Sequence, residues 1–372
     1  MLAPDDLDRD HLCMKEVDGT QLPDVVTGRK HFVTLDGLRG VAAICVMVFH
    51  YHTVFGGNAL LPHAFLAVDF FFLLSGLVVA HAYGEALKTG KMTIAEFIRR
   101  RAIRLYPLIA LGALLGAAFW IARRSSPLYL ELIWTGLALL ALPWLGRDTQ
   151  NGGIAPINPP AWSLFYELSA NLGYALIAKL LRPWLLAAIV LFAWCALAYL
   201  SNKADTLGLG QFSNTLPFGF ARVIFPFFFG IAIERSFKRY HNFVPRVPGW
   251  ILVLVLICTF LPAKDFHAAS QYELLCVTLI YPLIVVLGAA SIDGPRMTSA
   301  MQLSGELSYP LYILHMPTFH WLSAGINRTY AVPSIAKFFI CVLLAMIAAF
   351  LAARKYDEPT RRKLSGMWLA KL

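Results

Sequence analysis

Long apolar stretches, separated by short polar segments, recur along almost the whole chain. They lie at approximately 34–55, 66–83, 103–122, 129–145, 161–181, 184–200, 216–233, 248–262, 272–290, 303–323 and 333–353. About 20 apolar residues in an α-helix cross a hydrocarbon core of about 30 Å, and most of these stretches approach that length. The pattern predicts an all-α integral membrane protein with no large soluble domain between its helices.

Composition and charge agree with this prediction. Apolar residues make up 58% of the chain, charged residues only 15%, and the mean hydropathy is +0.62, far from the composition of a soluble domain. The net charge of +10 resides in short basic clusters between apolar stretches, where it sets topology rather than binding nucleic acid. Most of the cysteines lie inside apolar stretches and Cys13 is alone in a polar segment, so we expect neither a disulfide framework nor a metal site.

Three basic clusters set the predicted orientation. They occupy 99–104, 235–246 and 354–363, and the positive-inside rule places all three in the cytoplasm. The first two can share a side only if an even number of crossings separates them, yet an odd number of apolar stretches lies between them. The stretch 129–145 is short, carries Glu131 and contains a proline near its end, which favours a re-entrant or interfacial helix. We therefore expect about ten transmembrane helices plus this one, with both termini cytoplasmic, in a plasma (inner) membrane.

The chain divides into a membrane domain and two polar ends. Residues 1–30 are polar, acidic at their start and without the features of a cleaved signal, and we predict a disordered cytoplasmic tail there. Residues 31–356 hold all the apolar stretches and form the predicted transmembrane domain. Residues 357–372 are basic and form a second predicted cytoplasmic tail.

The first apolar stretch carries the sharpest candidate site. Arg39 and His50 are eleven positions apart, which in a helix is about three turns and about 16 Å, on nearly the same face. That rise matches the extended phosphopantetheine arm of a coenzyme A thioester, about 15 to 20 Å. Arginine suits the phosphate end of such a donor, and histidine suits proton transfer at the thioester end. The alternative is that Arg39 reaches lipid headgroups while His50 makes a structural polar contact.

Three further ionisable residues support a site near His50. In the predicted topology, Asp69, Glu167 and His315 fall at a depth similar to that of His50. Ionisable groups within a membrane are costly, so each is a candidate functional residue. We predict His50 as general base, with Asp69 or Glu167 as the carboxylate that supports its imidazole. The alternatives are capping of a helix start for Asp69 and a structural role for Glu167.

Arg101 and Arg104 share a face at the cytoplasmic start of one predicted helix. Together with Arg39 they are predicted to bind the phosphates of an acyl-CoA donor. Contact with anionic lipids explains the same pair nearly as well. Because the donor is a substrate, no tightly bound cofactor is expected.

Several short motifs, each weak alone, together resemble the membrane acyltransferase-3 family over most of residues 33–360. The motifs are Leu35-Asp36-Gly37-Leu38-Arg39-Gly40, Arg39 with His50 after ten intervening residues, Val68-Asp69-Phe70-Phe71 through Ser75-Gly76, Arg101 with Arg104, Trp162-Ser163-Leu164 with Glu167, Leu307-Ser308-Tyr309 through Leu314-His315, and Glu358-Pro359. Members of this family acylate envelope polysaccharides, lipopolysaccharide, nodulation factors and some antibiotics. The resemblance implies a ten-helix fold, acyl-CoA as donor, and Arg39 with His50 as an essential pair.

The same motifs supply candidate substrate-binding residues. These are Asp36, Ser75, Trp162, Ser163, Tyr309, Tyr312 and His315. For Trp162, an anchor at the membrane interface is the alternative.

The sequence thus predicts an O-acyltransferase. It would move an acyl group, acetyl in the first instance, from cytoplasmic acyl-CoA to a hydroxyl of a cell-envelope or exported polysaccharide or glycolipid. Acyl-CoA, the glycan acceptor and membrane lipids are the expected partners. The competing prediction is a transporter or flippase in which the same polar residues line a substrate path. The lack of an internal repeat, which is common in transporters, favours the enzyme.

Overall fold

The computed structural model describes residues 32–146, 152–263, 268–326 and 334–369. From Phe32 onward these residues form one unit. The predicted N-terminal tail, residues 1–30, lies outside the described residues.

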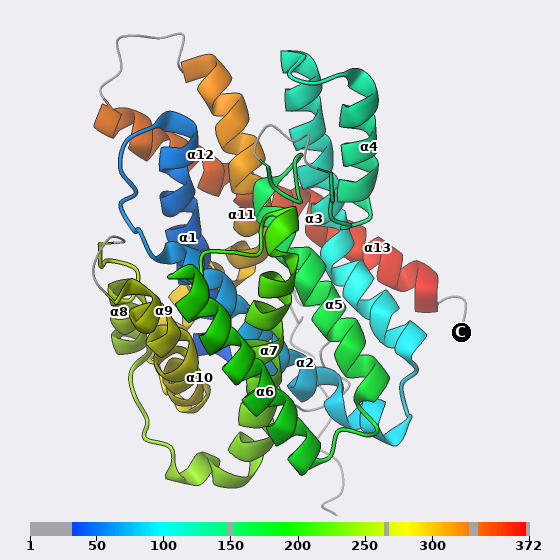
Figure 1. Ribbon diagram of the computed structural model, residues 1–372, viewed down its shortest axis with the longest axis vertical. Coiled ribbons are helices and arrows are strands. Elements are labelled where there is room, and N and C mark those ends of the chain that lie inside the picture. The colour runs from blue at the N-terminus through cyan, green and yellow to red at the C-terminus, as the bar shows by residue number, and fades with distance from the viewer. Residues whose placement is uncertain (1–31, 147–151, 264–267, 327–333, 370–372) are drawn as a thin grey trace, which may run out of the picture. The chain divides into compact units, whose positions relative to one another are not determined.

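The described residues are built from α-helices (Figure 1). The helices are α1 Val33–Phe55, α2 Ala67–Thr89, α3 Ile94–Arg123, α4 Leu128–Leu139, α5 Trp162–Ile177, α6 Pro183–Ala204, α7 Leu216–Tyr240, α8 Gly249–Cys258, α9 Ala269–Leu275, α10 Tyr281–Ala290, α11 Pro295–Ile326, α12 Ser334–Ala352 and α13 Glu358–Leu369. Single π turns join α9 to α10 and α12 to α13. In the described ranges, β pairing is limited to an isolated bridge between Gly153 and Phe212. The predicted all-α class is confirmed, and each apolar stretch is helical over at least part of its length.

Seven helical segments of the described residues are long and apolar enough to cross a bilayer. They are α1, α2, α3, α6, α7, the α9–α10 pair, and α12 with α13. In contrast, α4 and α8 contain 12 and 10 residues, about 18 and 15 Å of helix against a hydrocarbon core of about 30 Å. The length of α4 agrees with a helix that does not cross, whereas α8 lies in a stretch that the sequence counts as a crossing. These lengths indicate a membrane protein with several spanning helices. The number of ten spanning helices stays a prediction.

Large apolar side chains face outward as well as inward. Phe192 of α6, Ile335 of α12 and Leu132 of α4 are each more than half exposed. Apolar surface of this extent is unfavourable in water and is what helices facing lipid tails require. The outward faces therefore agree with a bilayer around the helices.

Small residues bring α1 and α11 into close parallel contact. Gly40 lies against the main chain of Ser304, and Gly37 lies against Met301. A side chain at Gly40 would collide with the Ser304 carbonyl. Membrane helices gain van der Waals contact by such close approach of their backbones, and here it places His50 beside α11.

Close packing at glycines also joins α2 to α7, and these two helices run parallel as well. Gly76 lies against the carbonyl of Phe227, and Gly230 lies against the carbonyl of Leu73. Neither position leaves room for a side chain without a shift of backbone. This contact places Asp69, two turns before Gly76, beside α7.

A proline in α11 leaves one backbone carbonyl of the helix without its usual partner, and this carbonyl holds a loop in place. Pro317 has no N–H, so the carbonyl of Ile313, four residues earlier, lacks its helical partner. The side-chain amide of Asn158 donates to that carbonyl at 2.9 Å, and the Tyr312 hydroxyl donates to the Pro160 carbonyl at 3.0 Å. The segment before α5 is thereby held against α11, where it forms one wall of a cavity.

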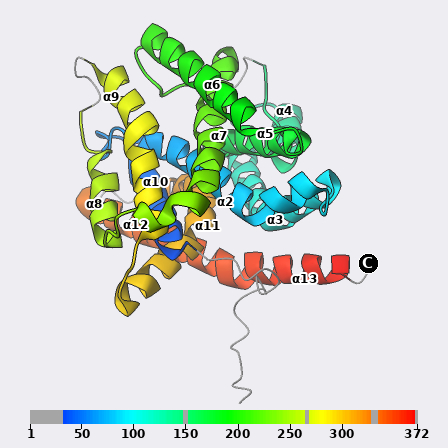
Figure 2. The same ribbon diagram turned by 90° about the horizontal axis from the view of Figure 1, so that it is seen from below.

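The C-terminal helix α13 continues from α12 and extends along the edge of the helical unit (Figure 2). The guanidinium groups of Arg99 and Arg100 in α3 lie over the ring of Trp368 at 5.9 and 5.0 Å. Cation–π contacts of this kind attach the helix to the basic start of α3. The predicted basic tail, 357–372, is therefore helical over most of its length.

Candidate functional site

A cavity of about 840 Å³ lies between α1, α3, α7 and α11 and the loops that precede α5 and α7. His50, Trp162 and Tyr312, three of the predicted site residues, line it. Its charged lining residues are Arg123 and Arg222, and no Asp or Glu occurs among the described residues of its wall. A cavity of this size accommodates a small ligand or one end of a larger one. The predicted general base therefore borders a basic, ligand-sized space.

His50 pairs with His315 of α11. The two nitrogens His50 Nδ1 and His315 Nε2 are 3.0 Å apart, and the rings stack with centroids at 5.1 Å and an angle of 21°. The His315 side chain is fully buried, and its Nδ1 lies 2.9 Å from the carbonyl oxygen of Leu311. Each ring nitrogen of His315 thus has one partner.

These contacts determine which nitrogen of His50 is basic. A carbonyl oxygen only accepts, so His315 carries its proton on Nδ1 and its Nε2 accepts from the Nδ1–H of His50. The Nε2 of His50 then keeps its lone pair, which is the form that removes a proton from a hydroxyl. Among the described residues, no group of three or more His, Cys, Asp or Glu is arranged to hold a metal ion.

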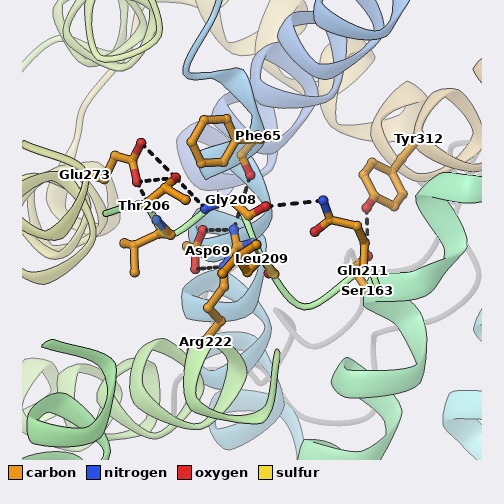
Figure 3. Close-up of polar contacts among 11 residues, drawn as sticks. Phe65, Asp69, Ser163, Thr206, Gly208, Leu209, Gln211, Arg222, Glu273 and Tyr312 are labelled. Atoms are coloured by element: carbon orange, nitrogen blue, oxygen red, sulfur yellow. Dashed lines mark hydrogen bonds and ion pairs between the residues drawn. The ribbon is translucent and has the colours of Figure 1, made fainter. Parts of the chain in front are cut away.

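Asp69 pairs with Arg222 of α7 (Figure 3). Both side chains are buried, and Arg222 donates from Nε and Nη2 to the two carboxylate oxygens at 3.1 and 2.5 Å. Two further donations from Arg222 reach the carbonyls of Leu209 and Phe65 at 2.8 and 3.4 Å. A bidentate arginine satisfies a buried carboxylate that would otherwise be strongly destabilising. Asp69 is therefore neutralised without the histidine.

A second buried carboxylate holds the neighbouring loop (Figure 3). Glu273 accepts from the hydroxyl of Thr206 at 3.0 Å and from the N–H of Leu207 at 2.5 Å, and it lies 3.4 Å from His63 Nε2. The chain then passes to Gln211, which lines the cavity. These contacts fix the shape of the wall.

Glu167 pairs with Arg101. The guanidinium of Arg101 donates to Glu167 Oε1 at 2.8 Å, and the hydroxyl of Ser75 donates to the same oxygen at 2.7 Å. Glu167 lies five residues after Trp162, about 7.5 Å further along α5, which carries it from the cavity toward the start of α3. Neither predicted carboxylate contacts the predicted general base, and a catalytic role for either stays a prediction.

Arg39, Arg101 and Arg104 form what we call the arginine cluster. Arg39 Nη2 lies 2.9 Å from Asp36 Oδ1, and Arg39 Nε donates to the hydroxyl of Ser308 at 3.2 Å. Arg104 lies within electrostatic range of both other arginines. None of the three lines the cavity. The predicted phosphate-binding arginines are gathered in one place, about 16 Å of helix away from His50.

The predicted substrate-binding residues divide between the arginine cluster and the cavity. Those at the arginine cluster are Asp36, Ser75 and Tyr309. Those lining the cavity are Trp162 and Tyr312. Ser163 lies behind the wall, where its hydroxyl bonds that of Tyr312 at 2.7 Å. His315 supports His50 rather than lining the cavity.

The sequence-based prediction lacks two features of the site. Arg222 lies within the apolar stretch 216–233, so the rule that selects Asp69, an ionisable residue inside a membrane segment, selects it too. The pairing of His50 with His315 depends on the direction in which two side chains point, and no pattern in one sequence carries that information.

Comparisons with known proteins give the following similarities. A family model described as "Acyltransferase domain" matches residues 32–354. "Acyltransferase MdmB" of Streptomyces mycarofaciens is 33% identical over 369 residues, covering 89% of this chain and 92% of that protein. "Protein 2 in picA locus" of Rhizobium radiobacter is 40% identical over 162 residues, covering 39% of this chain and 82% of that protein. "O-acetyltransferase OatA" of Staphylococcus aureus is 37% identical over 76 residues, 20% of this chain and 12% of that protein. No solved structure matches.

Proposed function

This chain belongs to the acyltransferase-3 family of O-acyltransferases, and we propose that it transfers an acyl group, acetyl in the first instance, from cytoplasmic acyl-CoA to a hydroxyl of a cell-envelope or exported glycan or glycolipid. The observation that carries the proposal is the His50–His315 pair at the wall of the cavity, which leaves one basic nitrogen for an acceptor. The relatives named acyltransferase and O-acetyltransferase support the same reaction class.

The proposed reaction needs one base. The acceptor hydroxyl gives its proton to His50 Nε2 while its oxygen attacks the carbonyl carbon of the thioester. The carbon–sulfur bond then breaks, and the leaving thiolate takes the proton from the imidazolium. The products are the oxygen ester and free CoA, and His50 returns to its starting form.

The proposed donor spans the distance between the arginine cluster and His50. Arginine binds phosphate through a planar fork of donors, so we assign the nucleotide end of acyl-CoA to Arg39, Arg101 and Arg104. The phosphopantetheine arm would then run along α1 toward His50, over about 16 Å of helical rise. The positive-inside rule places the arginine cluster at the cytoplasmic side, where acyl-CoA is made.

His50→Ala tests the proposal directly. We expect loss of about 10²- to 10⁴-fold in acyl transfer to envelope glycan, the usual contribution of a general base, with normal expression and membrane insertion. The readout is ester-linked acyl groups on envelope glycans, together with acyl-CoA consumption in isolated membranes. His52→Ala is the matched control, because His52 lies two residues further along α1, bonds the carbonyl of Phe49 and does not line the cavity.

Two results would refute the proposed role. Unchanged ester in His50→Ala would exclude this residue as the base. Glycan movement across the membrane without any consumption of acyl-CoA would instead support the competing transporter.

A further inference from the structure

We infer that the acceptor carries an anionic group, a carboxylate or a phosphate, which binds Arg123 and His320 on the cavity wall about one sugar ring away from the hydroxyl that is acylated. The inference rests on the proposed function and names the chemical class of its acceptor. It comes from the charges of the cavity wall.

Only one of the two charged groups of the described wall is neutralised by the protein. Arg222 forms an ion pair with Asp69, and it donates four hydrogen bonds to protein oxygens. Arg123, the last residue of α3, has no carboxylate of the described residues within ion-pair distance, and its guanidinium lies over the ring of Phe119 at 5.6 Å. Arginine is always charged in proteins. The cavity therefore keeps one positive charge that an anion can neutralise.

His320 supplies a second polar group beside Arg123. Its ring lines the cavity and stacks on Phe119 with centroids at 5.0 Å and an angle of 16°. It is 9% exposed, and its Nδ1 is buried without a hydrogen-bond partner in the described ranges. A buried polar group without a partner is destabilising. A neutral imidazole has one N–H to donate, which suits an oxyanion already drawn by the arginine.

The helical rise from His315 to His320 is about the length of one monosaccharide. His320 follows His315 by five positions on α11, which is about 7.5 Å along the helix axis. His315 holds His50, so the part of the wall that His320 forms lies about one sugar ring further along α11 than the base. A hydroxyl on one side of a ring can then meet His50 while an acidic substituent on the other side meets Arg123.

Two neighbouring arginines at the end of helix α3 distinguish this inference from a purely structural role for Arg123. Arginine at a helix C-terminus also complements the helix dipole or contacts lipid phosphate. Arg124, the next residue, shares that position but does not line the cavity. If the helix end or the lipid surface alone explains the arginines, the two residues should behave alike.

The test measures sugar binding without turnover. Full-length protein in phosphatidylcholine nanodiscs, without CoA, is titrated with methyl β-D-glucuronide, glucose 1-phosphate and methyl β-D-glucoside, and binding is followed by saturation-transfer NMR and thermal shift. We expect at least one of the anionic sugars to bind about tenfold more tightly than the neutral glucoside, the usual gain of a charge-assisted hydrogen bond. Whichever anionic probe binds identifies the group as a carboxylate or a phosphate.

Variants locate the effect. Arg123→Gln should remove the preference for anionic sugars and leave glucoside and CoA binding unchanged, Arg123→Lys should restore part of it, and Arg124→Gln should bind like wild type. His50→Ala should keep the preference for anionic over neutral sugars, so failure of the proposed acyl transfer would not hide the result. Equal binding of all three sugars by wild type would overturn the inference. Equal losses in Arg123→Gln and Arg124→Gln, or loss of CoA binding in Arg123→Gln, would also overturn it, because the charge would then serve the surface or the donor.

Discussion

His315→Ala is predicted to slow the proposed acyl transfer, because the variant loses the hydrogen bond that holds His50 in its reactive tautomer. The hydrogen bond between the two rings is neutral and 3.0 Å long, and such a bond contributes about 0.5 to 1.5 kcal/mol net. At tenfold per about 1.4 kcal/mol, its loss lowers the ratio of the reactive to the unreactive tautomer by about 2- to 12-fold. A neutral imidazole still populates this tautomer without the bond, so we expect partial rather than complete loss.

The variant His315→Gln is the decisive comparison. Glutamine places an amide oxygen near the position of the His315 Nε2 and accepts from His50 Nδ1 as the imidazole does. It also fills more of the volume that alanine leaves empty in a fully buried position. We therefore expect Gln to recover most of the rate that Ala loses.

The assay is steady-state acyl transfer by purified protein in nanodiscs, with thermal unfolding measured on each variant. A positioning role predicts a lower kcat with little change in either KM, because the tautomer matters only when the proton moves. A higher KM for the acceptor at constant kcat would instead show that His315 binds substrate, as the motif comparison suggests. Wild-type kcat in His315→Ala would refute the tautomer argument.

Two further changes test the other polar contacts. Asp69→Asn leaves Arg222 buried without its counter-charge and should lower stability by about 3 to 5 kcal/mol; an unchanged unfolding temperature in nanodiscs would contradict the importance of this pair. Arg39→Ala should weaken CoA binding at least tenfold by calorimetry, with partial recovery in Arg39→Lys, which keeps the charge but loses the planar fork. Equal CoA affinity in wild type and Arg39→Ala would place the donor elsewhere.

The helices follow from the sequence because the bilayer removes the alternatives. An apolar segment in lipid must satisfy its own backbone hydrogen bonds, so each long apolar stretch becomes a helix. The number of crossings does not follow in the same way. Hydropathy measures how favourably each side chain moves from water into an apolar medium, and it does not show where a helix ends. In α8 the helix ends at Cys258 although Phe260 and Leu261 continue the apolar run. The same limit applies to α4, whose apolar stretch runs on beyond Leu139.

The choice of partners within the site has a physical logic that sequence reasoning can use. A carboxylate in a dry environment needs a full positive charge nearby, and a neutral imidazole does not provide one. Asp69 forms an ion pair with an arginine of α7, and Glu167 forms an ion pair with an arginine of α3. His50 is then left to a neutral partner, His315. A base held by a neutral group keeps its lone pair without a buried counter-charge. In the proposed reaction its imidazolium would therefore be stabilised by the negative charge that develops on the thioester oxygen and the leaving sulfur.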